Sequence, residues 1–158
     1  MPVTSSRSSL KRWPRPDVVL DAAAAWGRRL AAERPEVVAV GCIGSYARGD
    51  AGVGSDLDVV IVRRDGTPRP DLLGADVAAL PVPVDALHYT VSELARVLGG
   101  GGRMAGVLVG EARWWVGGLP GVPREDLLAW LVEASADPGL RDDLASLVPE
   151  GGDDRDPP

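Results

Sequence analysis

Apolar and polar positions follow two different periods along this chain, and the pattern predicts both helices and strands. Residues 17–33 are rich in alanine and stop short of Pro35, which predicts a helix. Short runs of branched apolar residues predict buried strands at 36–43 and 57–64. The pattern then predicts, in order, a helix at 71–80, a strand at 84–90, helices at 91–99 and around 104–109, a strand at 112–117 and a helix at 123–135. Strands that alternate with helices indicate a sheet with helices packed on it.

The length of 158 residues predicts one domain with a single core. We place that domain at residues 17–136. The first 16 residues have basic side chains but no apolar block after them, so we interpret them as a flexible tail rather than a secretory signal. Residues 137–158 end in a polar, glycine- and aspartate-rich stretch and are predicted to be a second tail.

The charge and the cysteine content of the chain restrict the kinds of function and cellular location that it can have. The chain has 23 acidic and 17 basic residues and a net charge of −6, so it lacks the basic surface that long nucleic acids require. A small substrate or another protein is the expected partner. No apolar stretch reaches the roughly 18 residues that a membrane span needs. A single cysteine, Cys42, cannot form an internal disulfide, which favours the cytoplasm, and its apolar surroundings predict a buried, unreactive side chain.

Residues 44–62, GSYARGDAGVGSDLDVVIV, place small and polar residues between two apolar strands. A phosphate-binding P-loop is excluded because Asp50 stands where that loop needs a lysine. A calcium loop of the EF-hand kind is excluded because Gly52 and Gly54 stand at ligand positions and have no side-chain oxygen. The remaining interpretation is a strand, a Gly-Ser bend that opens a short helix, and a second strand led by Asp-x-Asp.

The Gly-Ser bend has the chemistry of an anion site. Gly44 allows a sharp turn and a close approach of the backbone to a ligand. Ser45 offers a hydroxyl and an N–H at the start of a helix, where anions are favoured. Arg48 lies three residues further on and can add a positive charge on the same face. We therefore predict that these three residues bind nucleotide phosphates, although Arg48 could instead pair with Asp50 or another surface acid.

Asp56 and Asp58 are two residues apart at the start of a strand, so their side chains point to one face. Two carboxylates held together repel one another unless a divalent cation lies between them, and Mg²⁺ favours a few carboxylates combined with substrate phosphates. Asp85 is an isolated acid in the apolar strand 84–90. If that strand lies beside 57–64, Asp85 completes a site for two Mg²⁺ ions and can accept a proton from an attacking hydroxyl. The alternative is that Asp85 only caps its strand.

Two further positions carry weaker signals. His88 is an odd number of residues from Asp85 and is expected on the opposite face of the strand, in a structural role. Trp114 and Trp115 are neighbours on a strand, so one is expected in the core and the other on the surface, where it would mark a partner site.

The Gly-Ser pair, the ten residues after it, the Asp-Leu-Asp triplet and the later isolated aspartate resemble the nucleotidyltransferase domain of the DNA polymerase beta superfamily. The sequence of residues 44–62 is most similar to that of the small prokaryotic minimal nucleotidyltransferases. The resemblance extends over about residues 17–117. It implies an α+β fold with a small mixed β-sheet of about four strands and helices packed on it. It also implies a phosphate-binding role for Gly44 and Ser45, Mg²⁺ ligation by Asp56, Asp58 and Asp85, and Asp85 as the catalytic base.

The resemblance implies transfer of NMP, with ATP as the expected donor, to an acceptor hydroxyl. The connector between the second and third strands is short, and the segment after residue 117 does not resemble the helical acceptor domain of larger relatives. We expect the acceptor to be a partner protein, as in toxin–antitoxin pairs in which a minimal nucleotidyltransferase adenylylates a helical HEPN toxin. The alternatives are a small molecule of the aminoglycoside type and a non-catalytic antitoxin that acts by docking alone.

Overall fold

The computed structural model describes residues 13–72, 77, 80–117, 129–133, 139 and 142. Its elements are, in chain order, α1 (Pro16–Glu33), β1 (Val37–Ile43), α2 (Gly44–Arg48), β2 (Leu57–Arg63), β3 (Val84–Thr90), α4 (Val91–Gly100), α5 (Arg103–Gly110) and β4 (Arg113–Val116). The predicted bounds of the four strands and of the helices α1, α4 and α5 are confirmed to within one residue. None of the helices in these described ranges is both long and apolar enough to cross a membrane.

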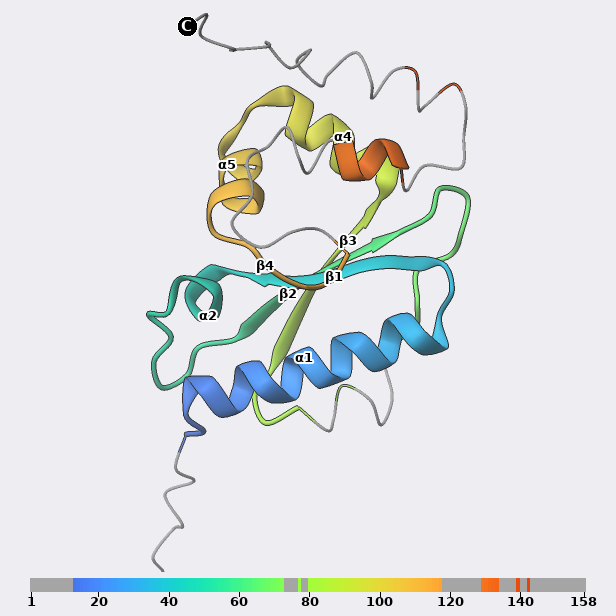
Figure 1. The fold of residues 1–158 in the computed structure, drawn as a ribbon. Coiled ribbons are helices and arrows are strands. Elements are labelled where there is room, and N and C mark those ends of the chain that lie inside the picture. Colours follow the sequence, from blue (N-terminus) through green and yellow to red (C-terminus); the bar gives the residue numbers. More distant parts are fainter. Residues whose placement is uncertain are drawn as a thin grey trace, which may run out of the picture.

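The four strands form one mixed sheet in the order β3-β2-β1-β4. Strand β1 pairs antiparallel with both β2 and β4, whereas β2 and β3 are parallel. Helix α1 covers one face of the sheet, and α4 and α5 cover the other (Figure 1). The predicted α+β fold with a four-stranded mixed sheet is therefore confirmed.

Each face of the sheet has its own apolar core. We call these the α1 core, which contains Trp26, Cys42 and Ile61, and the α4–α5 core, which contains Val60, Leu94 and Leu108. Because helices cover both faces, six of the seven residues in each of β1 and β2 are buried, as in a central strand.

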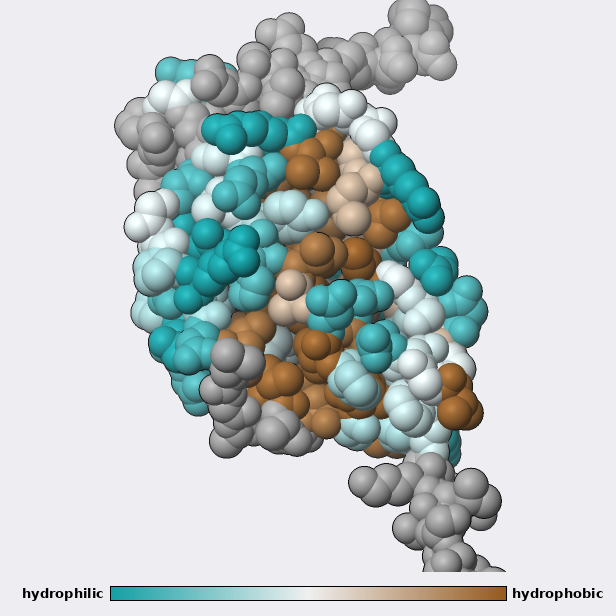
Figure 2. Space-filling view, turned by 180° about the vertical axis from the view of Figure 1, so that it is seen from behind, coloured by the Kyte–Doolittle hydropathy of each residue, from teal (hydrophilic) through white to brown (hydrophobic). Residues whose placement is uncertain are grey.

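Strand β3 lies at the edge of the sheet and is much more exposed. None of its seven residues is fully buried, and its side chains are a mixture of apolar and polar ones. The view from behind shows apolar side chains interspersed with polar ones over this side of the molecule (Figure 2). Of the two edge strands, β3 is the one without a buried residue.

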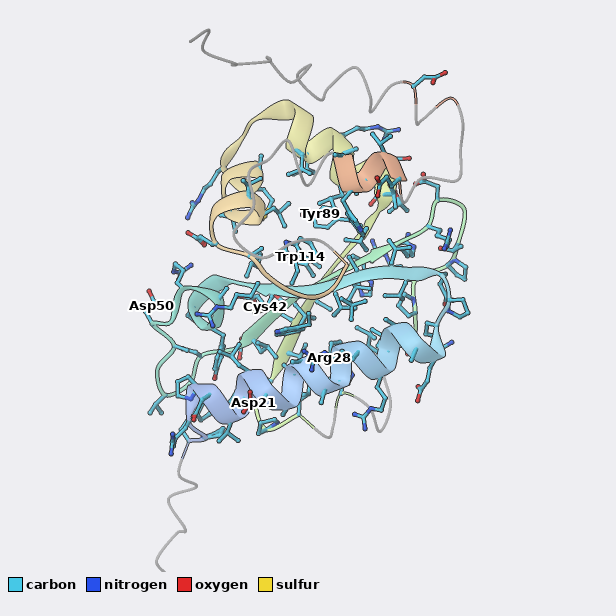
Figure 3. The ribbon with its side chains drawn as sticks, in the orientation of Figure 1. Asp21, Arg28, Cys42, Asp50, Tyr89 and Trp114 are labelled. Carbon is cyan, nitrogen blue, oxygen red and sulfur yellow. The ribbon has the colours of Figure 1, made fainter. Side chains whose placement is uncertain are left out.

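The expectation that one of the two adjacent tryptophans faces solvent is wrong. Trp114 is 7% exposed and lies in the α4–α5 core, on the same side of the sheet as Tyr89 (Figure 3). Trp115 packs against the α1 core, and its ring lies 3.2 Å from the position that a Cβ on Gly27 would occupy. The two side chains do point to opposite faces, but a helix covers each face, so neither marks a partner surface.

Several predicted elements fall wholly or partly outside the described residues. Residues 129–133 of the predicted helix at 123–135 are helical, and the rest of that helix lies outside the described part. Most of the predicted helix at 71–80 and most of the two predicted tails also lie outside it, so these boundaries stay predictions.

Candidate active site

The Gly-Ser bend forms where β1 ends. Gly44 has a φ of 76°, in the left-handed region that favours glycine, and it opens the five-residue helix α2. The helix ends at Gly49, which is also left-handed, and the N–H groups of Gly49 and Asp50 both donate to the carbonyl of Ser45, at 2.9 and 3.0 Å. Ser45 is thus held half-buried in a tight turn directly after a buried strand.

The loop between α2 and β2 is tied back to the helix. Gly52 donates its N–H to Ser55 Oγ at 2.9 Å, and Ser55 donates its own N–H to the carbonyl of Gly52 at 3.1 Å. The buried Tyr46 hydroxyl donates to the carbonyl of Ser55 and accepts from Trp13 Nε1, both at 3.4 Å. These contacts fix the direction from which the chain approaches Asp56. Neither Trp13 nor Tyr46 was among the predicted site residues.

Gly44 and Asp58 are very close. A Cβ placed on Gly44 would lie 2.5 Å from Oδ2 of Asp58, which is closer than real Cβ atoms come to another atom. The pairing of Ile43 with Asp58 across β1 and β2 brings this about. The structure therefore brings the start of the predicted phosphate site against one of the predicted metal ligands.

Asp58 and Asp85 are direct partners in the parallel pairing of β2 with β3. Directly paired residues in neighbouring strands point to the same face, and such strands lie about 4.8 Å apart. The N–H of Leu57 donates to the carbonyl of Pro83 at 2.9 Å, which anchors the two strands at the end where the acids lie. Asp56 precedes β2 and is exposed, as is Asp85, whereas Asp58 is half-buried. Strand β3 therefore does lie beside β2, as the predicted role of Asp85 requires.

The charges of the three acids affect one another. Burial raises the pKa of Asp58 above its ordinary value, the charges of Asp85 and Asp56 raise it further, and Arg48 opposes the shift. Carboxylates that are forced together in this way favour either a proton or a cation between them.

Among the described residues, no group of three or more His, Cys, Asp or Glu side chains is arranged so that it could hold a metal ion as it stands. The three aspartates are thus near one another without forming a finished ligand set. Their chemistry nevertheless fits Mg²⁺, which takes carboxylate oxygens and completes its coordination with water and substrate phosphates. The direct pairing of Asp58 with Asp85 on one face of the sheet is the structural observation that favours a cation here.

Arg48 lies near this group but is held by acids. Its Nε is 3.3 Å from Oδ2 of Asp50, and its Nη1 is 3.4 Å from Oε2 of Glu111. Arg113, on β4, donates from Nε to the carbonyl of Ala47 at 2.9 Å and so ties the edge strand to α2. The predicted alternative, a pair with Asp50, is therefore present. Glu111 and Arg113 have no local sequence signal, because they reach α2 only through the pairing of β4 with β1.

Cys42 and His88 lie on the other face of the sheet. The Cys42 thiol is fully buried, and burial raises its pKa to about 11, which confirms an unreactive core position. His88 lies on the α1 side of β3, opposite the face of Asp85, as predicted; Figure 3 shows the labelled Cys42 beside the sheet.

Comparison with known proteins gives the family. No relative was found among curated proteins. A crystal structure from Sulfolobus solfataricus, provisionally assigned as a nucleotidyltransferase, is 23% identical, covers 51% of this chain and 75% of its own, and has a TM-score of 0.38. The family model of the nucleotidyltransferase domain matches residues 28–118, a segment that runs from within α1 to just after β4 and includes Gly44, Asp58 and Asp85. The chain therefore belongs to the nucleotidyltransferase domain family and is a transferase of nucleotidyl groups with a nucleoside triphosphate as substrate.

Proposed function

We propose that this domain transfers AMP from ATP to a hydroxyl group of a helical partner protein, with Mg²⁺ as the cofactor. The observation that carries the proposal is the direct pairing of Asp58 with Asp85, at the point where Gly44 touches the Asp58 carboxylate. This arrangement puts a phosphate-binding bend and a carboxylate group next to each other inside the segment that matches the family.

In the proposed step, the acceptor oxygen attacks the α-phosphorus of ATP. A new P–O bond forms, the bond between the α-phosphorus and the bridging oxygen breaks, and pyrophosphate leaves with that electron pair. Asp85 takes the proton of the attacking hydroxyl, since it is exposed to an incoming acceptor while Asp58 is half-buried. Gly44 and Ser45 position the phosphates, and Asp56, Asp58 and Asp85 would hold Mg²⁺. The metal, when bound, neutralises the charge that develops on the transferring phosphoryl group.

The proposal also specifies that the acceptor is a protein and that the domain acts as an antitoxin. They are supported by the resemblance of residues 44–62 to the minimal nucleotidyltransferases. The small size of the matched segment also favours an acceptor that brings its own binding surface, because a domain of about 90 residues has little room for a second substrate domain.

The test uses ATP labelled at either the α- or the γ-phosphate, incubated with the protein, Mg²⁺ and an extract of the host cells. AMP transfer labels a protein band from the α-position and leaves the band unlabelled from the γ-position. Label in a small-molecule fraction would favour an aminoglycoside-type acceptor instead. Label from neither form in any fraction, with ATP binding intact, would contradict catalysis and favour a docking module.

A double variant and a matched control make the result specific to the site. Asp56→Asn with Asp58→Asn should abolish transfer and Mg²⁺-dependent ATP binding. Asp21→Asn, at an exposed position of α1 on the face of the sheet opposite Asp58 and Asp85, removes one negative charge where the double variant removes two, and should leave transfer and ATP binding unchanged (Asp21 is labelled in Figure 3). If the double variant still neutralises the partner in cells, docking alone accounts for the biological effect.

A further inference from the structure

A pocket lies against the edge strand β3 on the face opposite Asp85. It has a volume of about 350 Å³, which falls in the range of small-molecule sites. Its β3 wall is made by Val84, Ala86 and His88, alternate residues that point to the α1 side of the sheet. The pocket is therefore separated by the sheet from the acids of the candidate active site.

Most of the pocket wall is apolar. Leu72, Val77, Val84 and Ala86 are partly buried against the α1 core, and Pro70 is buried beside them. A ligand that fills this space gains by covering these side chains from water, at about 25 cal/mol per Å² of apolar surface. The wall is thus suited to an apolar or aromatic body rather than to a bare ion.

The polar part of the pocket lies next to two arginines. Arg69 is exposed at its rim, and His88 lines its floor. Arg63 lies behind the floor, since it is paired with Thr90, two residues beyond His88 on the same face of the sheet. The charges of Arg69 and Arg63 both act on His88 and, after burial, are the causes that lower its pKa, so the imidazole is neutral at pH 7 and the two arginines supply the charge.

Arg63 is a buried charge that has no acid partner among the described residues. It is only 9% exposed, its Nε donates to the carbonyl of Thr67 at 2.9 Å, and within the described ranges its Nη1 has no hydrogen-bond partner and no acid pairs with it. His88 Nδ1 is likewise buried without a partner in those ranges. A buried charge without a counter-charge is costly, and such groups in folded proteins call for a compensating partner.

One acid also lines the pocket. Asp71 is exposed and takes part in an interaction of its own, so it reduces the positive potential at the rim without reaching the buried Arg63. The nearby Asp65 is committed elsewhere, since its carboxylate accepts from the N–H and the hydroxyl of Ser92, at 3.1 and 2.7 Å. Among the described lining residues Arg69 and Asp71 carry opposite charges, and Arg63, behind the strand wall, adds a positive charge that acts on His88.

We propose that this pocket binds a small molecule that carries a carboxylate or phosphate group on an apolar body, with the anionic group between Arg69 and His88. The anion would compensate the buried charge of Arg63, and the body would cover the wall formed by Leu72, Val84 and Ala86. This site is distinct from the nucleotide site and does not depend on the function proposed above.

The test uses the fact that His88 is the only histidine in the chain, so the spectrum contains a single histidine Hε1 resonance. The probes are phenyl phosphate, benzoate, inorganic phosphate and the neutral benzyl alcohol. We expect a saturable shift of the His88 signal with phenyl phosphate or benzoate, and binding about tenfold weaker or more for benzyl alcohol and for inorganic phosphate.

Arg69→Gln should weaken binding of the better probe about tenfold, and because Arg69 is exposed the variant should fold normally. Arg96→Gln is the matched control, since Arg96 is an exposed arginine on α4, on the other side of the sheet, and it should bind the probe like the parent protein. Three outcomes would each overturn the proposal: no shift with any probe at about 20 mM, well above a weak Kd of about 1 mM; equal binding of benzyl alcohol; or unchanged binding in Arg69→Gln.

Discussion

Gly44 and Asp58 are so close that a single added methyl group on the glycine would collide with the carboxylate. The Cβ of any other residue would lie 2.5 Å from Oδ2, and the φ of 76° is itself unfavourable for a side chain. The phosphate bend and the acid group thus share one contact, and changes to one are transmitted to the other.

This contact predicts different outcomes for two glycine variants. Gly44→Ala should lose transfer activity by about 100-fold because it displaces Asp58. Gly49→Ala is the matched control, since Gly49 is also left-handed but a Cβ there meets nothing within 4 Å. That variant should lose only about 1–2 kcal/mol of folding free energy from backbone strain and keep most of its activity. Equal activity of the two variants would contradict the importance of the contact.

Neutralising Asp58 should stabilise the metal-free protein at neutral pH. The pKa of Asp58 in the fold lies above its ordinary value of 3.8, so ionisation opposes folding, and stability is lost as the pH rises through the folded pKa. Asp58→Asn removes that loss, and we expect its Tm at pH 7 to exceed that of the parent by a few degrees, about 2–4 °C. Near pH 3, where Asp58 is protonated in both states, the two melting temperatures should converge. A thermal melt across this range gives the comparison.

Mg²⁺ should reverse the order of the melting temperatures, so that the parent protein melts above Asp58→Asn. If the cation binds the aspartates, millimolar Mg²⁺ with ATP raises the Tm of the parent by mass action and leaves that of Asp58→Asn nearly unchanged. The same shift in both proteins would mean that Mg²⁺ and ATP bind somewhere other than at this carboxylate.

Arg48 should contribute to nucleotide binding once it is released from its acids. Arg48→Gln is expected to raise the KM for ATP about tenfold with little change in kcat, because the contact is made in the ground state. Glu111→Gln frees one side of the guanidinium and should lower KM about two- to threefold. Steady-state kinetics of both variants give the answer. If neither KM moves, Arg48 serves only a surface ion pair.

Cys42 should be inert in the native protein. Its thiol is fully buried and burial raises its pKa to about 11, so little thiolate is present at pH 8. Reaction with a disulfide reagent such as DTNB should be more than about 100-fold slower than in denaturant. Fast labelling of the folded chain would show that β1 opens readily or that the thiol reaches solvent.

His88 should titrate below its ordinary value of 6.5 because burial, followed by the charges of Arg69 and Arg63, disfavours the imidazolium. Stability that depends on the neutral ring is therefore lost as the pH falls through the lowered pKa. NMR titration of the single histidine signal measures this directly. In Arg69→Gln the pKa should move back toward 6.5, whereas in Arg96→Gln it should not.

The elements could be predicted well because their signals are local. Branched apolar runs predict β1 and β2, and alanine content together with Pro35 bounds α1, without any knowledge of the fold. The error at Trp115 arose because local alternation cannot show how many faces of a sheet are covered. The helix that buries Trp115 is 80 or more residues earlier in the chain.

The site residues could be predicted only as far as the pairing of neighbouring strands could be assumed. Asp56 and Asp58 share a face through their spacing alone, but the placement of Asp85 opposite Asp58 required β3 to lie beside β2 in one particular register. The ion pair of Arg48 with Glu111 joins residues 63 positions apart and has no local sign. The positive pocket beside β3 likewise depends on the register that brings Arg63 next to His88.

The position of β3 at the margin of the sheet affects how the domain loses activity on heating. This strand has a bonded neighbour on one side only, and it carries Asp85. Outer strands detach in partial openings that cost less free energy than global unfolding. Warming should therefore separate the third acid from its partner before the central strands β1 and β2 unfold, and heat inactivation would precede melting.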